Sequence, residues 1–189
     1  MKKSMVVILM VGLFALCAQA TPTLTLIPSN GGVSGLPGDT VGWGFTVTND
    51  STTEWLSLSG SVFNQTGGLP FQGNYVDYIS NPMAPFVVVG PSPESSSVME
   101  TFDSVLLTGT GEFDIASTAN SGPIIGNIVV SYDVFSQDPN DPSFDPGSYL
   151  FSGMLTADAS VNVPEPASAM MLLAGTPLLL GSLRRKLCR

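Results

Sequence analysis

Apolar residues occupy every second position in three stretches of the chain. The stretches are 40–49, 127–134 and 155–163. In the first of them, the apolar side consists of Val41, Trp43, Phe45 and Val47. A two-residue period is typical of a β-strand that buries one face and exposes the other. We therefore predict a strand in each stretch, with one face in a core and one face toward solvent.

Shorter strand candidates lie between these stretches, bounded by Gly, Pro, Asn or Ser. They are 56–63, 85–90, 98–102 and 113–116. No segment between the two ends of the chain shows the sustained 3.6-residue apolar repeat of a helix. Seven to nine short strands with Gly- and Pro-rich connections favour an all-β fold. We predict one domain over residues 21–163, a two-sheet β-sandwich of the immunoglobulin-like or a related kind.

The first twenty residues have the features of a secretory signal peptide. Lys2 and Lys3 precede an uninterrupted apolar run, and Ala18 and Ala20 supply the small residues that signal peptidase requires. Cleavage is expected directly after Ala20. Acylation of Cys17 is an alternative, although Leu16 before it is bulky where such processing sites carry a small residue.

The last segment, 164–189, combines three features in order. It begins with Pro164, Glu165 and Pro166, continues through the uncharged stretch 167–183, and ends with a basic cluster. The cluster contains Arg184, Arg185 and Lys186. As a helix the uncharged stretch would span about 25 Å, slightly less than the hydrocarbon core of a bilayer. Basic residues stay on the cytoplasmic side, so we expect a transmembrane helix that leaves the preceding domain outside.

This arrangement resembles the PEP-CTERM sorting signal of exported proteins in Gram-negative bacteria that make exopolysaccharide. In that family an exosortase, a multi-pass membrane enzyme, recognises the motif that here is Pro164, Glu165 and Pro166. The resemblance implies that the helix and the basic tail are removed. Segments 35–49 and 132–142 also resemble a domain that recurs on such proteins, and the resemblance implies no known activity for it.

Charge is divided sharply along the chain. All six Lys and Arg residues lie in the two terminal segments, and the chain has no His. Fourteen of the fifteen Asp and Glu residues lie in residues 21–163. Because this part of the chain has no cation, its net charge is about −14. Because binding to nucleic acid relies on Lys and Arg contacts with phosphate, we exclude nucleic acid and anionic lipid headgroups as direct partners. The two cysteines also lie in the terminal segments, which excludes a disulfide and thiol chemistry from the domain.

Candidate chemistry within the domain is sparse. One loop gathers oxygen ligands that suit calcium: Asp138, Asn140, Asp141 and Asp145. Their spacing differs from that of an EF-hand, and a solvated acidic turn is the alternative. We predict no catalytic residues and no cofactor other than this calcium. Triad and phosphoryl-transfer chemistry need His, Lys or Arg, whereas glycoside hydrolysis by two facing carboxylates stays open.

The leading hypothesis is a non-enzymatic exported protein. It would begin as a membrane-anchored precursor and end at the cell surface or in the extracellular matrix, with exopolysaccharide as a partner. One alternative is a carbohydrate-binding module, for which exposed aromatic residues are needed and Trp55, Tyr75 and Tyr78 are the candidates. A second alternative is a calcium-dependent adhesin.

Overall fold

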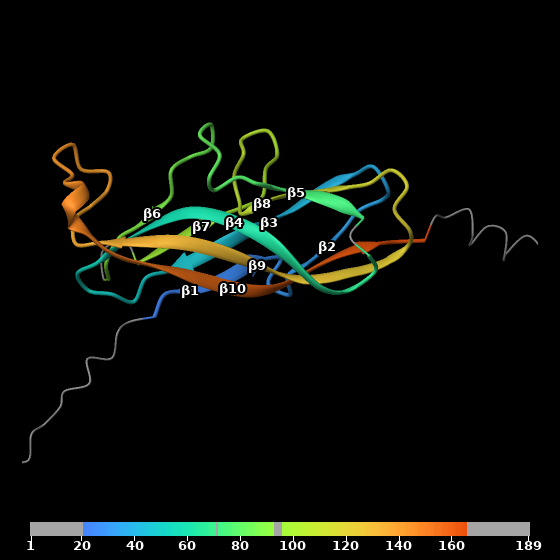
Figure 1. The fold of residues 1–189 in the computed structure, drawn as a ribbon, viewed down its shortest axis with the longest axis horizontal. Coiled ribbons are helices and arrows are strands. Elements are labelled where there is room, and N and C mark those ends of the chain that lie inside the picture. The colour runs from blue at the N-terminus through green and yellow to red at the C-terminus, as the bar shows by residue number, and fades with distance from the viewer. Residues whose placement is uncertain (1–20, 71, 93–95, 166–189) are drawn as a thin grey trace, which may run out of the picture.

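A computed structural model describes residues 21–70, 72–92 and 96–165. This part of the chain forms ten β-strands and one turn of 3₁₀ helix (Figure 1). The elements are β1 (Thr23–Ile27), β2 (Gly32–Ser34), β3 (Thr40–Thr48), β4 (Trp55–Gly68), β5 (Gly73–Asp77), β6 (Val88–Val89), β7 (Ser97–Glu100), β8 (Gly111–Ile115), β9 (Gly122–Phe135), η1 (Pro146–Ser148) and β10 (Tyr149–Val163). The predicted signal peptide and the predicted transmembrane helix lie outside the described residues.

The strands form two five-stranded sheets. In the first sheet the order is β1-β3-β8-β5, and β7 pairs with β3 beyond the segment that pairs with β8. In the second sheet the order is β2-β10-β9-β4-β6. All these pairs are antiparallel except β10 with β2. In Figure 1, β4, β9 and β10 lie in front of β1 and β3. The predicted two-sheet sandwich is therefore confirmed.

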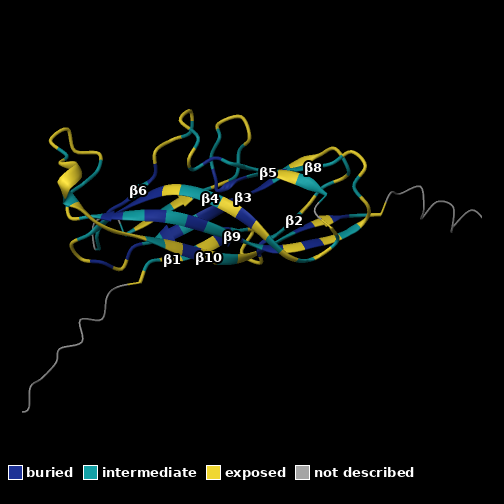
Figure 2. Ribbon diagram, in the orientation of Figure 1, coloured by how far each residue is buried: buried dark blue, intermediate teal, exposed yellow. Residues whose placement is uncertain are grey.

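The core lies between the sheets, where the inward sides of the strands meet (Figure 2). Trp43, Phe45 and Val47 are fully buried, which confirms the apolar side predicted for this strand. The indole N–H of Trp43 donates to the carbonyl of Gly31 over 2.8 Å. A buried Trp needs such an acceptor because an unpaired N–H in a core is costly.

The other face of β3 differs from its prediction. Gly42 and Gly44 are buried, although this side was expected to face solvent. A methyl group at Gly42 would overlap the ring of Phe102, and one at Gly44 would overlap the backbone of Glu100. The chain after β7 crosses this face, so the two glycines provide the room for the crossing.

Each predicted strand overlaps an observed one, but the boundaries differ. The strands β4, β9 and β10 extend well beyond their predicted ranges, whereas the predicted strand 85–90 is reduced to β6. The sequence reading missed β1, β2 and β5. All three lie at sheet edges, where a strand has a neighbour on one side only and buries few side chains. Such strands carry a weak alternating signal.

Candidate functional site

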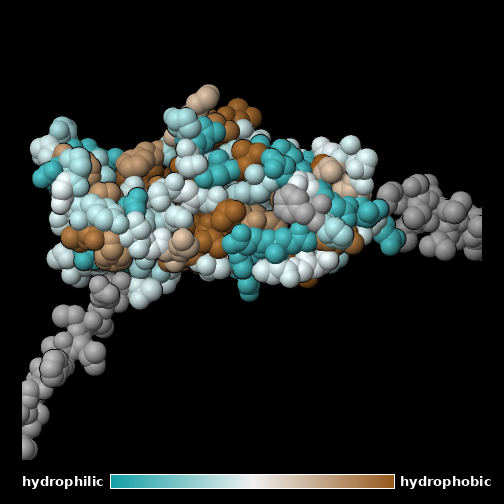
Figure 3. Space-filling model, in the orientation of Figure 1, coloured by the Kyte–Doolittle hydropathy of each residue, from teal (hydrophilic) through white to brown (hydrophobic). Residues whose placement is uncertain are grey.

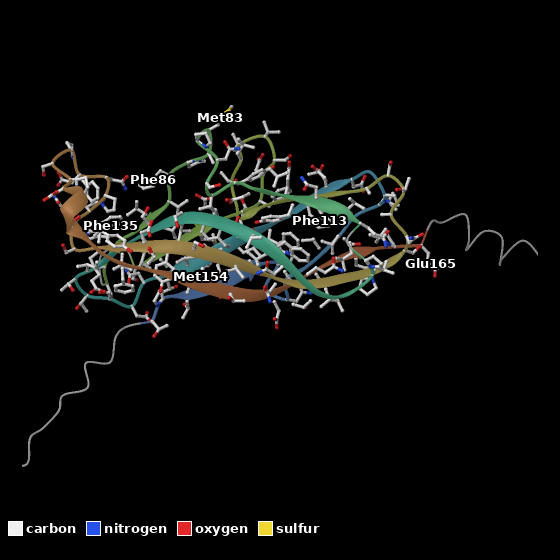
Figure 4. The ribbon with its side chains drawn as sticks, viewed as in Figure 1. Met83, Phe86, Phe113, Phe135, Met154 and Glu165 are labelled. Carbon is white, nitrogen blue, oxygen red and sulfur yellow. The ribbon has the colours of Figure 1, made fainter. Side chains whose placement is uncertain are left out.

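A groove of about 480 Å³ lies on the outer side of the second sheet. Its wall is the loop between β5 and β6, and its floor comes from β4 and β9. The lining residues are Ser57, Leu58, Ser59, Ile79, Ser80, Asn81, Pro82, Ala84, Pro85, Phe86, Asp133 and Phe135. Figure 4 shows Phe86 and Phe135 at the same end of the molecule, remote from Glu165.

A β-bulge shapes the floor of this groove. The register of β4 against β9 shifts between Leu58 and Gly60, so Ser59 is an extra residue without a partner on β9. Bulges of this kind re-aim side chains and are frequent beside binding sites. Here the shift places Ser59 on the exposed groove surface while Ser61, two residues later, forms hydrogen bonds with residues of the first sheet and its loops.

A chain of hydrogen bonds orients the single carboxylate of the groove. The hydroxyl of Ser152 donates to Oδ1 of Asp133 over 2.5 Å. The Tyr149 and Ser152 hydroxyl oxygens are 2.9 Å apart. Among the hydrogen bonds of the described residues, none involves Oδ2 of Asp133. This oxygen is therefore available to a hydroxyl or amide donor that enters the groove.

Two phenylalanines give the groove apolar surface. Phe135 is held from behind by edge-on contacts with Phe144 and Tyr149, at ring-centroid distances of 5.3 and 5.9 Å. Phe86 is different, because 62% of its surface is exposed. The apolar areas on this side are small and separated by hydrophilic surface, as Figure 3 shows. Phe86 is thus one of a few large apolar side chains in reach of a ligand here.

The wall loop is fixed by local hydrogen bonds. Oδ1 of Asn81 accepts from the N–H of Met83 over 3.0 Å, and the Asn81 carbonyl accepts from the N–H of Ala84 over 3.0 Å. At the base of the loop, Tyr78 stacks on Phe102 with ring centroids 6.2 Å apart. Asn at the first position of a turn favours such a conformation because its side chain caps the backbone. Residues 81–84 of the wall loop therefore form a hydrogen-bonded turn.

Two other hollows lie elsewhere on the described part of the chain. One, of about 540 Å³, is bounded by β5, β8 and the segment 116–120 and contains Asp114. The other, of about 170 Å³, lies near the start of β1 and contains Glu54. Each of the three hollows is lined by one carboxylate, whereas glycoside hydrolysis uses two.

In the acidic loop, each carboxylate caps its own turn. Oδ1 of Asp138 accepts from the backbone N–H of Asn140, and Oδ1 of Asp145 accepts from that of Gly147. The hydroxyl and the backbone N–H of Ser143 both donate to Asp141, which lowers the pKa of its carboxyl.

The hydrogen bonds of the acidic loop do not test whether calcium binds there, and calcium binding stays a prediction. Among the described residues, no three acidic side chains are grouped closely enough to hold a metal ion. A calcium ion bound by Asp138, Asn140, Asp141 and Asp145 would require the loop to rearrange.

The aromatic candidates for carbohydrate binding lie elsewhere than expected. Tyr78 is buried, with its hydroxyl donating to Glu112, so it offers no surface to a ligand. Tyr75 packs against the core, and its hydroxyl is 2.8 Å from that of Ser61. Burial raises the pKa of Tyr75 to about 12 and also raises the pKa of Tyr78. Trp55 is half-buried.

The sequence pattern did not identify Phe86 as an exposed loop residue, and it gave no indication that Asp133 lies in a groove. Phe86 was placed in a predicted strand, although Pro82 and Pro85 before it are typical of a loop. Asp133 was recognised as lying opposite the apolar side of its strand. Only the tertiary structure brings the two residues to one groove.

The segment predicted to be a sorting motif begins where the sandwich ends. Strand β10 stops at Val163, Pro164 is half-buried and Glu165 is exposed. Pro166 and the basic residues Arg184, Arg185 and Lys186 lie outside the described residues, as do Ala18 and Ala20. In the described part of the chain, no helix has the length and hydropathy to cross a bilayer.

Comparisons with known proteins give only distant likenesses. No protein-family model matches the sequence, and no curated protein matches it. Among solved structures, the chain is similar to the solution structure of CaCohA2 from Clostridium acetobutylicum. The sequence identity is 19%, the TM-score is 0.28, and the match covers 77% of this chain and 92% of that chain.

Two further solved structures show comparable likeness. One is a family 123 glycoside hydrolase from Clostridium perfringens, studied for glycolipid glycan hydrolysis, with 16% identity, a TM-score of 0.30, and coverage of 76% of this chain and 27% of that one. The other is a crystal structure of a complex of a CaDoc0917 variant with CaCohA2, with 16% identity, a TM-score of 0.25, and coverage of 76% and 99%. At these TM-scores, none of the three informs on the ligand or activity of this chain.

Proposed function

We propose that this chain is a non-enzymatic exported protein of the cell surface or extracellular matrix, sorted and cleaved by an exosortase. One observation carries the proposal. All ten strands of the described residues lie between Thr23 and Val163, and this interval falls between the predicted signal-peptidase site after Ala20 and the motif that begins at Pro164. Removal of both predicted processing segments therefore takes away no strand of the sandwich.

The position of the motif supports this route. Glu165 is exposed directly beyond the last strand, where Pro164 keeps the chain from continuing the sheet ladder. We propose that the precursor is held by a transmembrane helix in 167–183 and that a membrane-embedded exosortase reads the exposed motif. The body released would be an immunoglobulin-like or related sandwich.

Two observations support a role without catalysis. Residues 21–163 contain no His, Lys or Cys, so the general bases and nucleophiles that these residue types supply are absent from the domain. Each hollow described above contains one carboxylate. We therefore propose display and binding rather than turnover, with exopolysaccharide as a partner.

Mass spectrometry of the exported protein tests the sorting route. We expect an N-terminus at Thr21 and the loss of most of 167–189 in cells that have the exosortase. The Glu165→Gln variant and an exosortase deletion should both retain the tail, whereas Asp158→Asn, an exposed carboxylate on β10, should be processed normally. Retention of the tail by the unaltered protein, with no effect of the deletion, would contradict the proposal.

The calcium-dependent adhesin stays an alternative. It requires Asp138, Asn140, Asp141 and Asp145 to bind one ion together, and calcium linkage to stability is its test. For the carbohydrate-binding alternative, the candidate site is the groove of the second sheet. Its aromatic residues are Phe86 and Phe135 instead of the predicted Trp55, Tyr75 and Tyr78.

A further inference from the structure

We propose that the groove between the wall loop 79–86 and the outer side of β4 and β9 binds a neutral, hydroxyl-rich oligosaccharide. In this arrangement Phe86 packs against the face of a sugar ring and Asp133 accepts a hydrogen bond from a sugar hydroxyl. The inference rests on the carbohydrate binding proposed above and names its site and ligand class, and it does not depend on the export or sorting route.

The exposure of Phe86 is the first support. A ring with 62% of its surface exposed loses the benefit of burial in the free protein, and a ligand that covers it recovers that benefit. Sugar rings carry faces of C–H groups that pack against aromatic faces. The ring follows the hydrogen-bonded turn at Asn81 in the same loop.

The hydrogen-bonding groups of the groove are the second support. Oδ1 of Asp133 is fixed by Ser152, so the carboxylate is already oriented while Oδ2 keeps its accepting capacity. Ser59 and Ser80 add hydroxyl groups that are exposed in the groove. A ligand with many hydroxyl groups satisfies these donors and acceptors together, which an apolar ligand cannot do.

Charge decides between ligand classes. The described residues contain no Lys, Arg or His, so the groove has no cation to neutralise a phosphate, sulfate or uronate. A second copy of the chain is disfavoured by a net charge of about −14 on each copy. The acidic domain as a whole would attract a basic ligand, but the groove itself offers such a ligand one carboxylate. A neutral oligosaccharide needs no charged partner, and the serine hydroxyls and the carboxylate of the groove accept hydrogen bonds from its hydroxyl groups.

The volume also fits such a ligand. At about 480 Å³, the groove is within the usual range for small-molecule sites, roughly 300–1,000 Å³. It lies at the end of the sandwich remote from Glu165, so the sorting motif and the groove do not compete for space (Figure 4).

Calorimetry and saturation-transfer NMR test the proposal on the full chain in a detergent that has no sugar headgroup. The probes are cellohexaose, mannohexaose and maltohexaose, with oligogalacturonate as an anionic control. We expect at least one neutral probe to bind with a Kd between micromolar and millimolar, and the anionic control to bind at least about tenfold more weakly.

Variants locate the site. Phe86→Ala and Asp133→Asn should each weaken binding at least about tenfold, while Met83→Ala, on the same loop but outside the groove, should not change it. Thermal unfolding verifies that each variant is folded. Absence of binding of all three neutral probes at millimolar concentration would overturn the proposal, as would unchanged binding by folded Phe86→Ala. The mass of the exported protein measures sorting independently, so a failure of sorting and a failure of oligosaccharide binding are distinguishable.

Discussion

Trp43 and Phe63 stack across the interior of the sandwich, with ring centroids 5.7 Å apart and ring planes 11° from parallel. The two residues belong to different sheets, since Trp43 lies on β3 and Phe63 on β4. Phe113 of β8 packs edge-on against Phe63, with centroids 5.6 Å apart. In a domain without a disulfide, these ring contacts join the two sheets together with the hydrogen bonds of Ser61.

Substitution of Phe63 should therefore destabilise the fold strongly. We expect Phe63→Ala to lower the free energy of unfolding by about 3–5 kcal/mol, because it removes a buried ring and leaves a cavity between the sheets. Val62→Ala, at the neighbouring exposed position, should change it by less than about 1 kcal/mol. Urea denaturation followed by Trp fluorescence measures both, and similar losses would show that the stack is not central to stability.

Gly126 should tolerate no side chain. A methyl group there would overlap the carbonyl oxygen of Asn64 on the neighbouring strand and lie 2.7 Å from Cζ of Phe63. We expect Gly126→Ala to cost about 2 kcal/mol or more, because the strands must move apart or the ring must leave its position. Gly67→Ala is the matched control, since nothing lies within 4 Å of its added methyl. Equal unfolding midpoints for the two variants would contradict the register of β9 against β4.

Alkaline pH should weaken the fold through buried tyrosines. Burial raises the pKa of Tyr75 to about 12 from about 10 in the unfolded chain. The unfolded state loses this proton first, so the stability from Tyr75 is complete below about pH 10 and is lost as pH rises toward 12. The direction is the same for Tyr78 and Tyr132, whose pKa values are also raised by burial.

A variant isolates the contribution of Tyr75. The free energy of unfolding of the unaltered chain, measured by urea denaturation, should fall between about pH 10 and pH 12, and this fall should be smaller in Tyr75→Phe by about 2 kcal/mol. The variant should also lose about 1 kcal/mol at neutral pH, because Ser61 loses a hydrogen-bond partner. An identical pH dependence in the two proteins would mean that Tyr75 ionises as a solvated phenol.

The acidic loop gives a direct test of calcium binding. If Asp138, Asn140, Asp141 and Asp145 enclose a calcium ion, millimolar calcium should raise the melting temperature, since a ligand that binds only the folded state stabilises it. The rise should disappear in Asp138→Asn combined with Asp141→Asn. Sodium chloride at matched ionic strength corrects for screening of the acidic domain. A melting temperature that responds equally to both salts would remove the adhesin alternative.

The sequence predicted strands best where they lie inside a sheet. The alternation around Trp43, Phe45 and Val47 identified both the strand and its buried side, because such a strand has to place every second side chain in the core. At the edges the same reasoning failed for β1, β2 and β5, which have one neighbour and bury less.

The candidate site was less accessible to sequence reasoning. Tyr78 was expected at the surface, yet it stacks on Phe102 and contacts Glu112, residues distant in the sequence. The pattern predicts a strand over 85–90 that includes Phe86, yet this residue lies exposed on a loop. Whether an aromatic residue is buried depends on which loop covers it, and the local pattern carries no information about that.

The sequence by itself determined the all-β class, the buried side of its central strands and the absence of cations from the domain. These features follow from residue types and from a local period of two. Only the tertiary structure decided which strands pair, that the chain crosses one side of β3, and that Phe86 and Asp133 share a groove. Pairing and crossing depend on contacts between residues far apart in the chain. An extra residue such as Ser59 in β4 changes the side that the following residues face, up to the second register shift between Gln65 and Gly67.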